Sequence, residues 1–289
     1  MISHGRRRRG PAQPWLAAAG LLCVVAISAI LWAANQPPTN TMASEAATPT
    51  PTNTLAPGQA PPTPTTAAGS ATVVGVGDSV TSATVCGCTG FVESYAAHLP
   101  TADGGPARAV NLGTDGLTAA ALRTAITAPG PVADGVAKGD ILLVTIGAND
   151  LVPLLSQWQT SGCSSACYSP AVDTVGSDLR AILATAKALR GGRATRVLVM
   201  DYWNVFADGN VGRDSDGPAY LRWSDEITRA VNSRICAAAQ NAGATCVDLY
   251  GPFKGDGSLN PTALLAADGD HPNVAGNQLI SSTLLAATP

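Results

Sequence analysis

The chain has 289 residues, with 17 basic and 20 acidic side chains and a formal net charge of −3 at pH 7. Aromatic residues make up only 4% of it, and no basic patch is interleaved with aromatic side chains, which argues against a nucleic-acid-binding protein. Arg6–Arg9 hold four of the 17 basic residues and no acid precedes Glu45, so the remainder has 13 basic against 20 acidic residues, a net charge of −7. This acidic remainder is not expected to bind anionic lipid headgroups by bulk attraction.

The amino-terminal region indicates export. Residues 1–14 form a basic tail, and the 20 residues of Trp15–Ala34 are uncharged and apolar, which is long enough to span a bilayer core. Positive charge flanks only the amino side, so the tail is expected to stay cytoplasmic and the remainder to lie outside. We favour an uncleaved, single-pass signal anchor in the cell membrane over a cleaved signal peptide, because residues 32–34 make a poor cleavage site. If the segment is cleaved, the protein is secreted.

Residues 35–70 are rich in Pro, Thr and Ala and carry almost no charge beyond Glu45. Such a segment cannot bury a core, and it is predicted to be an extended, disordered tether. Its Thr/Pro runs are candidates for O-linked sugar, which we state as a hypothesis. Residues 71–289 have the length of one domain with a sizeable core, and they contain no internal repeat.

Strand and helix signals alternate through residues 71–289, which predicts an α/β domain with a parallel sheet and helices on both faces. Strands are expected near 72–76, 108–112, 141–146, 195–201 and 244–248, and helices near 91–99, 117–128, 171–190, 222–241 and 274–287. Two segments, 151–170 and 204–223, interrupt this rhythm. Both follow the carboxyl ends of strands, so they are expected to border the site as substrate walls, with ordinary surface loops as the alternative.

The first strand runs into a tight turn that presents Ser79 behind Gly77 and Asp78. Near the other end of the chain, Asp268 stands three residues before His271. A serine on a turn, a histidine and an aspartate are the parts of a nucleophilic hydrolase.

The histidine census narrows the choice of a base. The chain has 3 histidines, of which His4 lies in the basic tail and His98 in a short helix-like run, so His271 is the candidate. Asp268 is the preferred partner for it, because residues three apart in a helical turn share one face. Asp270 is the competitor, but neighbouring side chains diverge.

Two further strands end in residues that could bind a developing oxyanion. The second strand ends at Gly113, and the third is followed by Asn149. Because ligands bind outside the carboxyl ends of parallel strands, Ser79, Gly113 and Asn149 are expected on one rim. A glycine amide and an asparagine amide are suitable oxyanion donors.

Other motifs fail. The Gly-x-Gly at Gly75 lacks the third glycine of a dinucleotide fingerprint, and the serine turn lacks the Gly-x-Ser-x-Gly of the α/β-hydrolase elbow. No acidic cluster or His-Glu-x-x-His run indicates a metal. No cofactor is expected.

These blocks resemble the SGNH, or GDSL-type, hydrolase family. The signature residues correspond to Ser79 in Gly-Asp-Ser, Gly113, Asn149 in Gly-Ala-Asn-Asp, and His271 in Asp-x-x-His-Pro. They occur in the family's order, and the resemblance spans roughly 71–288; Val80 replaces the usual leucine after Gly-Asp-Ser. It implies a three-layer α/β/α fold with a five-stranded, flavodoxin-like parallel sheet.

The resemblance also implies roles. Ser79 would attack an acyl carbonyl, His271 would act as base and then acid, and Asp268 would orient His271. The Ser79 amide, the Gly113 amide and the Asn149 side chain would form the oxyanion hole. We therefore expect a serine esterase or lipase, active as a monomer on an acyl or acetyl ester of a lipid, carbohydrate or small molecule. The alternative is an acyltransferase or a non-catalytic, glycan-binding surface protein.

The cysteines agree with export. Cys23 lies in the apolar segment, and the other six form the close pairs Cys86/Cys88, Cys163/Cys167 and Cys236/Cys246. Even numbers in an exported domain indicate disulfides, although six cysteines allow fifteen connectivities. Local bridges are natural for the second and third pairs, whereas the first would close a very small ring, so that its cysteines could pair elsewhere. Zinc is the rival interpretation.

Overall fold

The structure is a computed structural model that describes residues 71–101 and 104–288. Within them, five parallel strands form one sheet in the order β2-β1-β3-β4-β5. Their bounds are β1 Thr72–Gly77, β2 Arg108–Gly113, β3 Ile141–Thr145, β4 Arg196–Met200 and β5 Thr245–Val247. This is the flavodoxin-like order, and it confirms the predicted fold class and all five predicted strands.

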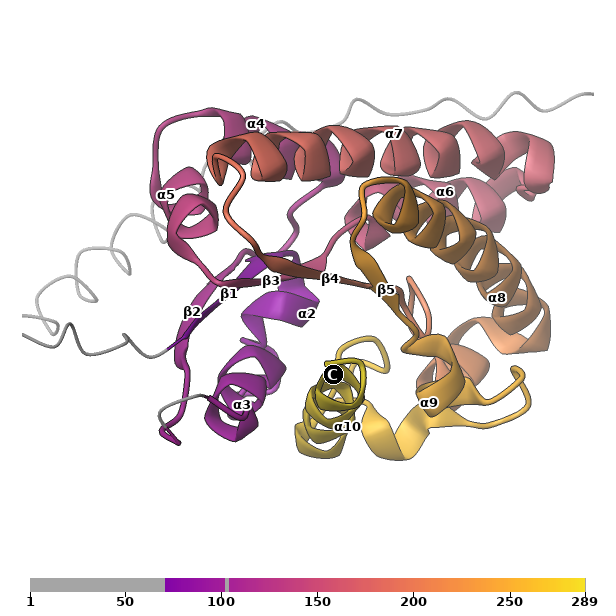
Figure 1. The fold of residues 1–289 in the computed structure, drawn as a ribbon. Helices are drawn as coiled ribbons and strands as arrows, with labels where there is room; N and C mark the ends of the chain where they lie inside the picture. The colour runs from indigo at the N-terminus through magenta and orange to yellow at the C-terminus, as the bar shows by residue number, and fades with distance from the viewer. Residues whose placement is uncertain (1–70, 102–103, 289) are drawn as a thin grey trace, which may run out of the picture. The chain divides into compact units, whose positions relative to one another are not determined.

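Helices cover both faces of the sheet (Figure 1). The helices α4, α5 and α7 lie over one face, and α3 and α10 lie side by side against the other. Their bounds are α2 Ser79–Ser82, α3 Phe91–His98, α4 Ala119–Thr127, α5 Pro131–Lys138, α6 Ala148–Ser161, α7 Ser165–Leu189, α8 Gly209–Asn241, α9 Tyr250–Lys254, a 3₁₀ turn η1 Pro261–Leu264 and α10 Val274–Ala286.

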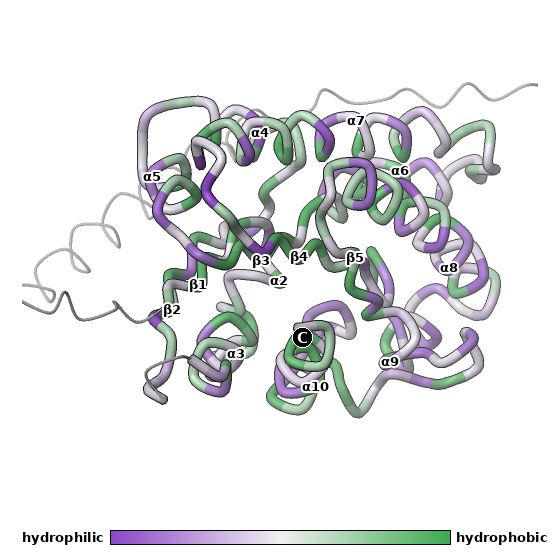
Figure 2. Tube along the Cα trace, viewed as in Figure 1, coloured by the Kyte–Doolittle hydropathy of each residue, from purple (hydrophilic) through white to green (hydrophobic). Residues whose placement is uncertain are grey.

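The core lies on the central strands. Every residue of β3 is buried, because a parallel strand that is covered by helices on both faces has no solvent side. Its sequence is accordingly one apolar run, Ile-Leu-Leu-Val, before Thr145. Hydrophobic residues gather along the central strands, and hydrophobic and hydrophilic residues alternate along the long helices (Figure 2).

Two segments expected to be irregular are helical. Most of 151–170 belongs to α6 and the start of α7, and most of 204–223 belongs to α8. Pro153 lies inside α6, where it removes one backbone hydrogen bond, while Leu151 and Leu154 bury the helix against the core. In α8, Gly217 breaks the helix with a φ of 79°, so two helical pieces meet there.

The aromatic residues of these two segments pack on each other. The ring of Trp158 lies 5.3 Å from that of Trp223 and 5.6 Å from that of Tyr220. Trp223 is 6% exposed and Tyr220 is 1% exposed. Tyr220 and Trp223 are therefore core residues and Trp158 packs on them half-buried, so none of the three rings is the substrate wall that we predicted.

The three close cysteine pairs are all bonded locally. The Cα–Cα distances are 5.1 Å for Cys86–Cys88, 5.2 Å for Cys163–Cys167 and 5.0 Å for Cys236–Cys246. The first pair closes its small ring and does not pair elsewhere. Cys23, the apolar segment Trp15–Ala34 and the Pro/Thr-rich residues 35–70 lie outside the described residues. Among the helices that are described, none is long and apolar enough to cross a bilayer.

Candidate active site

Ser79 stands at the carboxyl end of β1, at the first position of α2. The strand stops at Gly77, whose φ is 142° and whose added Cβ would lie 1.8 Å from the Thr145 carbonyl oxygen, so only glycine fits there. Asp78 then caps α2 by accepting a hydrogen bond from the Val80 amide at 3.1 Å. The amide of Ser79 is the first of this helix and has no carbonyl partner within it.

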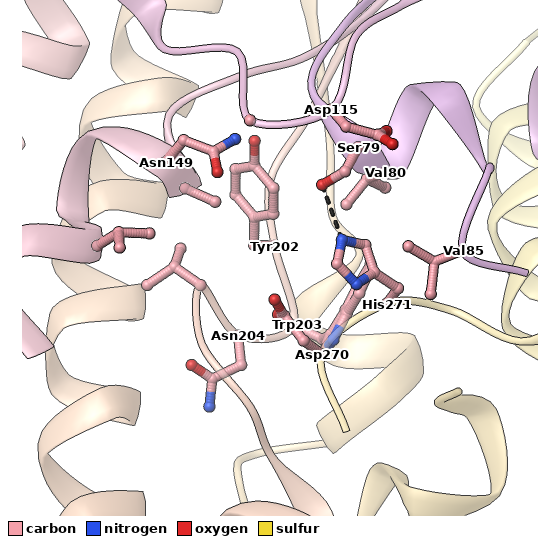
Figure 3. A pocket seen from close by; sticks show the side chains of 14 residues that line it. Ser79, Val80, Val85, Asp115, Asn149, Tyr202, Trp203, Asn204, Asp270 and His271 are labelled. Carbon is pink, nitrogen blue, oxygen red and sulfur yellow. Dashed lines mark hydrogen bonds between the residues drawn. The ribbon is translucent and has the colours of Figure 1, made fainter. Parts of the chain in front are cut away.

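The structure brings Ser79, His271 and Asp268 into one chain of hydrogen bonds, although 192 residues separate the serine from the histidine. The Nε2 atom of His271 lies 2.8 Å from Ser79 Oγ (Figure 3). Its Nδ1 atom lies 2.7 Å from Asp268 Oδ2. This is the geometry in which an imidazole can accept the hydroxyl proton of serine while a carboxylate holds its other nitrogen.

The approach of Asp268 to His271 does not depend on the helical turn we expected. Asp268 Oδ1 accepts the backbone N–H groups of Asp270 and His271 at 3.0 and 3.1 Å, which folds the segment into an aspartate turn. Across it, the Ala266 amide donates to the His271 carbonyl at 2.7 Å. The histidine is therefore fixed by local hydrogen bonds.

The two candidate orienting carboxylates differ in environment. Partial burial raises the pKa of Asp268, but the Asp270 amide and the His271 ring and amide lower it more, so the pKa lies below its ordinary value. Burial raises the pKa of Asp270, offset in part by His271. Asp268 is the carboxylate that contacts the imidazole, and this contact favours its charged form, while Asp270 lines the pocket.

A buried network underlies the serine. Asp78 is fully buried and accepts hydrogen bonds from Thr145 Oγ1 at 2.9 Å and from the Tyr202 hydroxyl. Burial raises the pKa of Asp78 to about 6, although these hydrogen bonds lower it. The network ties the end of β1 to the ends of β3 and β4 and so fixes the turn that carries Ser79.

Asn149 lies on the rim beside the serine. It belongs to the first turn of α6, and one N–H of its side chain donates to the Leu117 carbonyl at 3.0 Å. The side-chain nitrogen lies on the Ser79 side of the pocket, so its second N–H is available to an oxyanion (Figure 3).

Gly113 does not lie where we predicted its amide to act. Its N–H donates to the side chain of Asn111 at 3.0 Å, and an added Cβ would lie 2.3 Å from the Ser82 amide nitrogen. Gly113 therefore serves the close packing of β2 against α2. Gly116 lines the pocket instead, and within residues 71–101 and 104–288 its N–H donates to no protein acceptor. In the sequence, Gly116 was marked only as a second glycine, three residues after Gly113.

The pocket has a volume of about 200 Å³ and opens beside Ser79. Sequence reasoning missed several of its lining residues, which come from the loops after α2, β2 and β4: Val85, Asp115, Gly116 and Tyr202. From the two predicted wall segments, only Val152, Asn204 and Val205 line it. In the described part of the chain, no three His, Cys, Asp or Glu side chains are grouped so as to hold a metal ion.

Comparison with known proteins identifies the family. The profile of the GDSL-like Lipase/Acylhydrolase family matches residues 76–279. The lipase Lip_vut3 from a goat rumen metagenome is similar in structure, with a TM-score of 0.64 and 19% identity over 76% of this chain and 98% of that one. A catalytic mutant of Axe2, an acetylxylan esterase from Geobacillus stearothermophilus, has a TM-score of 0.53 and 21% identity over 75% of this chain and 94% of that one. At these identities the solved structures show the fold alone.

No curated protein matches the chain. The profile covers more than half of the sequence, and the chain belongs to the GDSL-like lipase and acylhydrolase family.

Proposed function

We propose that the chain is a serine esterase that hydrolyses short acyl esters with Ser79 as nucleophile, His271 as acid and base, and Asp268 as the orienting carboxylate. The observation that carries the proposal is the unbroken run of hydrogen bonds from Asp268 through His271 to Ser79, at 2.7 and 2.8 Å.

The mechanism follows from the positions of these atoms. As Ser79 Oγ attacks the acyl carbon, its proton moves to His271 Nε2, and Asp268 stabilises the imidazolium. The carbonyl oxygen becomes an oxyanion within reach of the Ser79 amide, the Gly116 amide and the Asn149 side chain. His271 then gives the proton to the leaving alcohol. Water, activated by the same histidine, releases the acid from Ser79 and restores the enzyme.

The size of the pocket supports a small acyl group. About 200 Å³ is below the usual volume of a pocket for a drug-sized ligand, roughly 300–1,000 Å³. Acetyl or similarly short acyl groups fit this space, and an acetylxylan esterase is among the structures of the same fold. We therefore place acetyl esters, including those of carbohydrates, first among the candidate substrates.

We also propose that the enzyme works outside the cytoplasm, tethered to the membrane by residues 15–34. The argument rests on the sequence, whose basic tail and apolar stretch have the order of a signal anchor. Local disulfides in the folded domain support an oxidising location. Fractionation of cells that express the full chain tests this. Recovery of the protein in the soluble cytoplasmic fraction would contradict it.

Hydrolysis of p-nitrophenyl acetate, butyrate and decanoate by the full-length protein tests the catalytic proposal, with Ser79→Ala beside it. We expect turnover that is fastest on acetate and is abolished in the variant, which should keep its melting temperature. An equal rate in Ser79→Ala would refute the mechanism.

A further inference from the structure

The Val85 loop, residues 83–90, joins α2 to α3 beside the pocket. It begins at Ala83, whose φ of 56° turns the chain sharply after α2, and it ends at Gly90. A Cβ on Gly90 would lie 2.8 Å from that of Ala83. The loop therefore leaves and returns at one point, as a compact Ω-type loop does.

One side of the Val85 loop is anchored by the carboxylate of Asp115. This carboxylate accepts hydrogen bonds from the hydroxyl groups of Ser82 and Thr84, the second at 2.6 Å. The Thr84 carbonyl in turn accepts the Gly87 amide at 3.2 Å. Asp115 precedes Gly116, so the anchor belongs to the segment that also presents the proposed oxyanion amide.

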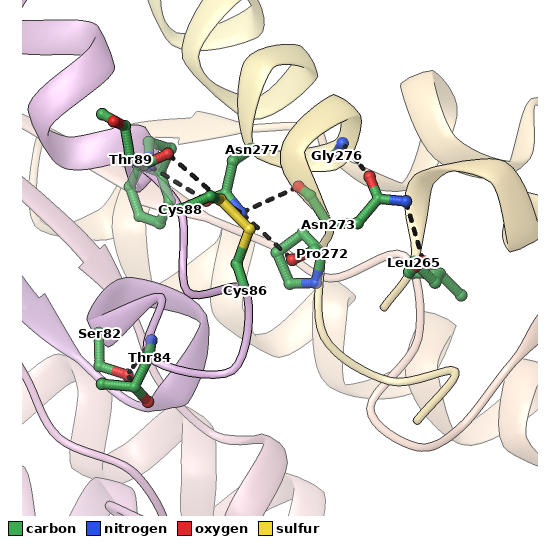
Figure 4. Close-up of a disulfide and its surroundings, with 11 residues drawn as sticks. Ser82, Thr84, Cys86, Cys88, Thr89, Leu265, Pro272, Asn273, Gly276 and Asn277 are labelled. Carbon is green, nitrogen blue, oxygen red and sulfur yellow. Dashed lines mark hydrogen bonds between the residues drawn. A yellow bond between two sulfur atoms is a disulfide. The ribbon is translucent and has the colours of Figure 1, made fainter. Parts of the chain in front are cut away.

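The other side is anchored by the disulfide between Cys86 and Cys88 (Figure 4). The side-chain amide of the buried Asn277 contacts Cys88 Sγ at 3.9 Å and donates to the Pro272 carbonyl at 3.2 Å. Pro272 directly follows His271. One buried side chain thus joins the disulfide to the segment that carries the histidine.

Val85 lies between these two anchors. Its side chain lines the pocket although it is 45% exposed, so an apolar surface faces both the pocket and solvent. It lies beside His271, on the side away from Asn149 (Figure 3).

The position of Val85 relative to the proposed chemistry fixes which part of an ester it can touch. The oxyanion must point to Asn149, and the leaving oxygen must reach His271 Nε2 to receive its proton. The alcohol part of the substrate therefore lies on the His271 side, next to Val85. We infer that the Cys86–Cys88 disulfide holds Val85 against the alcohol part, so that the loop selects esters whose alcohol has an apolar face. This inference rests on the proposed esterase function.

The test uses two acetate esters whose phenols have nearly equal acidity, phenyl acetate and 4-tert-butylphenyl acetate. In Val85→Ala we expect the ratio of kcat/KM for the bulkier ester to that for phenyl acetate to fall about fivefold, because apolar contact is lost. The matched control is Val274→Ala, since Val274 is 53% exposed and does not line the pocket. Its ratio should equal that of the wild type. The ratio for phenyl butyrate to phenyl acetate should not change in either variant.

The disulfide is tested by the double variant Cys86→Ser/Cys88→Ser, with Cys163→Ser/Cys167→Ser as control. The first should lower the same alcohol ratio about threefold to fivefold, because Val85 loses its anchor. The second should leave the ratio unchanged. The two-residue separation of Cys86 and Cys88 constrains the unfolded chain little, so the melting temperature of the first variant should stay close to that of the wild type.

The outcomes separate this inference from the proposed function. Ser79-dependent hydrolysis with an unchanged alcohol ratio in Val85→Ala would overturn the role of the Val85 loop and leave the esterase proposal standing. A changed butyrate ratio would assign Val85 to the acyl side and also overturn it. A wild-type protein that hydrolyses none of the esters would overturn both.

Discussion

The serine turn (residues 77–82) and the histidine loop (residues 265–272) meet at one hydrogen bond, yet they are built in different ways. The serine turn starts from a buried strand. Beneath it, the fully buried side chain of Asp78 accepts hydrogen bonds from Thr145 at the end of β3 and from Tyr202 just after β4. In the histidine loop, the side chain of Asp268 is 39% exposed and its hydrogen bonds stay within its own turn.

This difference separates stability from activity. A buried polar network that ties three strand ends together contributes to folding, so substitutions beneath the serine turn should affect the free energy of unfolding. Among the residues that the structure describes, the side chain of Asp268 bonds only to its own turn and to the His271 ring, and that ring bonds in addition only to Ser79. Substitutions of these two side chains should affect turnover and leave the fold almost unchanged.

The strongest test of the histidine loop is His271→Ala. We expect kcat/KM for p-nitrophenyl acetate to fall by about 10⁴-fold or more, because the serine loses its base. The melting temperature should change little, since in the described part of the chain the ring hydrogen bonds only to Ser79 and Asp268 and no other side chain depends on it. His98→Ala on the exposed end of α3 is the control and should retain full activity. Unfolding of His271→Ala would contradict the separation of stability from activity.

Asp268→Asn should have the next largest effect. We expect kcat to fall about 10³-fold, because an amide cannot stabilise the imidazolium and favours the wrong tautomer. Asp270→Asn is the matched control, since Asp270 lines the pocket but does not contact the His271 ring in the described structure. It should lose less than about tenfold. Steady-state kinetics on p-nitrophenyl acetate distinguish the two, and the reverse order would make Asp270 the orienting group.

Asn149→Ala addresses the oxyanion and should lower kcat about 10²–10³-fold, the usual cost of one donor, with little change in KM. Asn149→Asp should be slower still, because a carboxylate would repel the developing charge. Comparable kcat values for the wild type and Asn149→Ala would show that the backbone amides alone bind the oxyanion.

Much of this arrangement could be predicted from the sequence. A buried parallel strand leaves a continuous apolar run, as 141–145 does for β3. The edge strands β2 and β5 are only partly buried, and they were predicted from the alternation of strand and helix signals. The order of the strands, however, came from the family resemblance. Ser79 was identified by the tight turn that follows the first strand, His271 because the two other histidines lie in unsuitable segments, and Asp268 by its spacing from His271. Their catalytic roles remain predictions.

The identity of the glycine donor could not be predicted, because it depends on a single contact. Gly113 and Gly116 both follow the second strand, and only the hydrogen bond from the Gly113 amide to Asn111 shows which amide is already occupied.

Parts of the helices α6 and α8 were missed because their helical conformation depends on contacts between distant residues. Pro153 and Gly217 indicate breaks in the local sequence, whereas the packing of buried residues such as Leu151 and Tyr220 keeps the flanking chain helical.

The last prediction concerns the serine turn and its stability. Burial raises the pKa of Asp78 from 3.8 to about 6, so the folded state binds this proton more tightly than the unfolded chain does. The stability that Asp78 contributes is therefore full below pH 3.8 and is lost as the pH rises to about 6, by about 3 kcal/mol. Asp78→Asn does not titrate, and it keeps an oxygen for the Val80 and Thr145 donors. Its free energy of unfolding relative to the wild type should thus rise by about 3 kcal/mol between pH 3.8 and pH 7, measured by urea denaturation.

Tyr202→Phe removes a hydrogen bond that lowers the pKa of Asp78. In this variant, the loss of stability that accompanies ionisation of Asp78 should therefore extend to higher pH. A difference between Asp78→Asn and the wild type that does not vary with pH would show that the carboxyl group is not the titrating element of the serine turn.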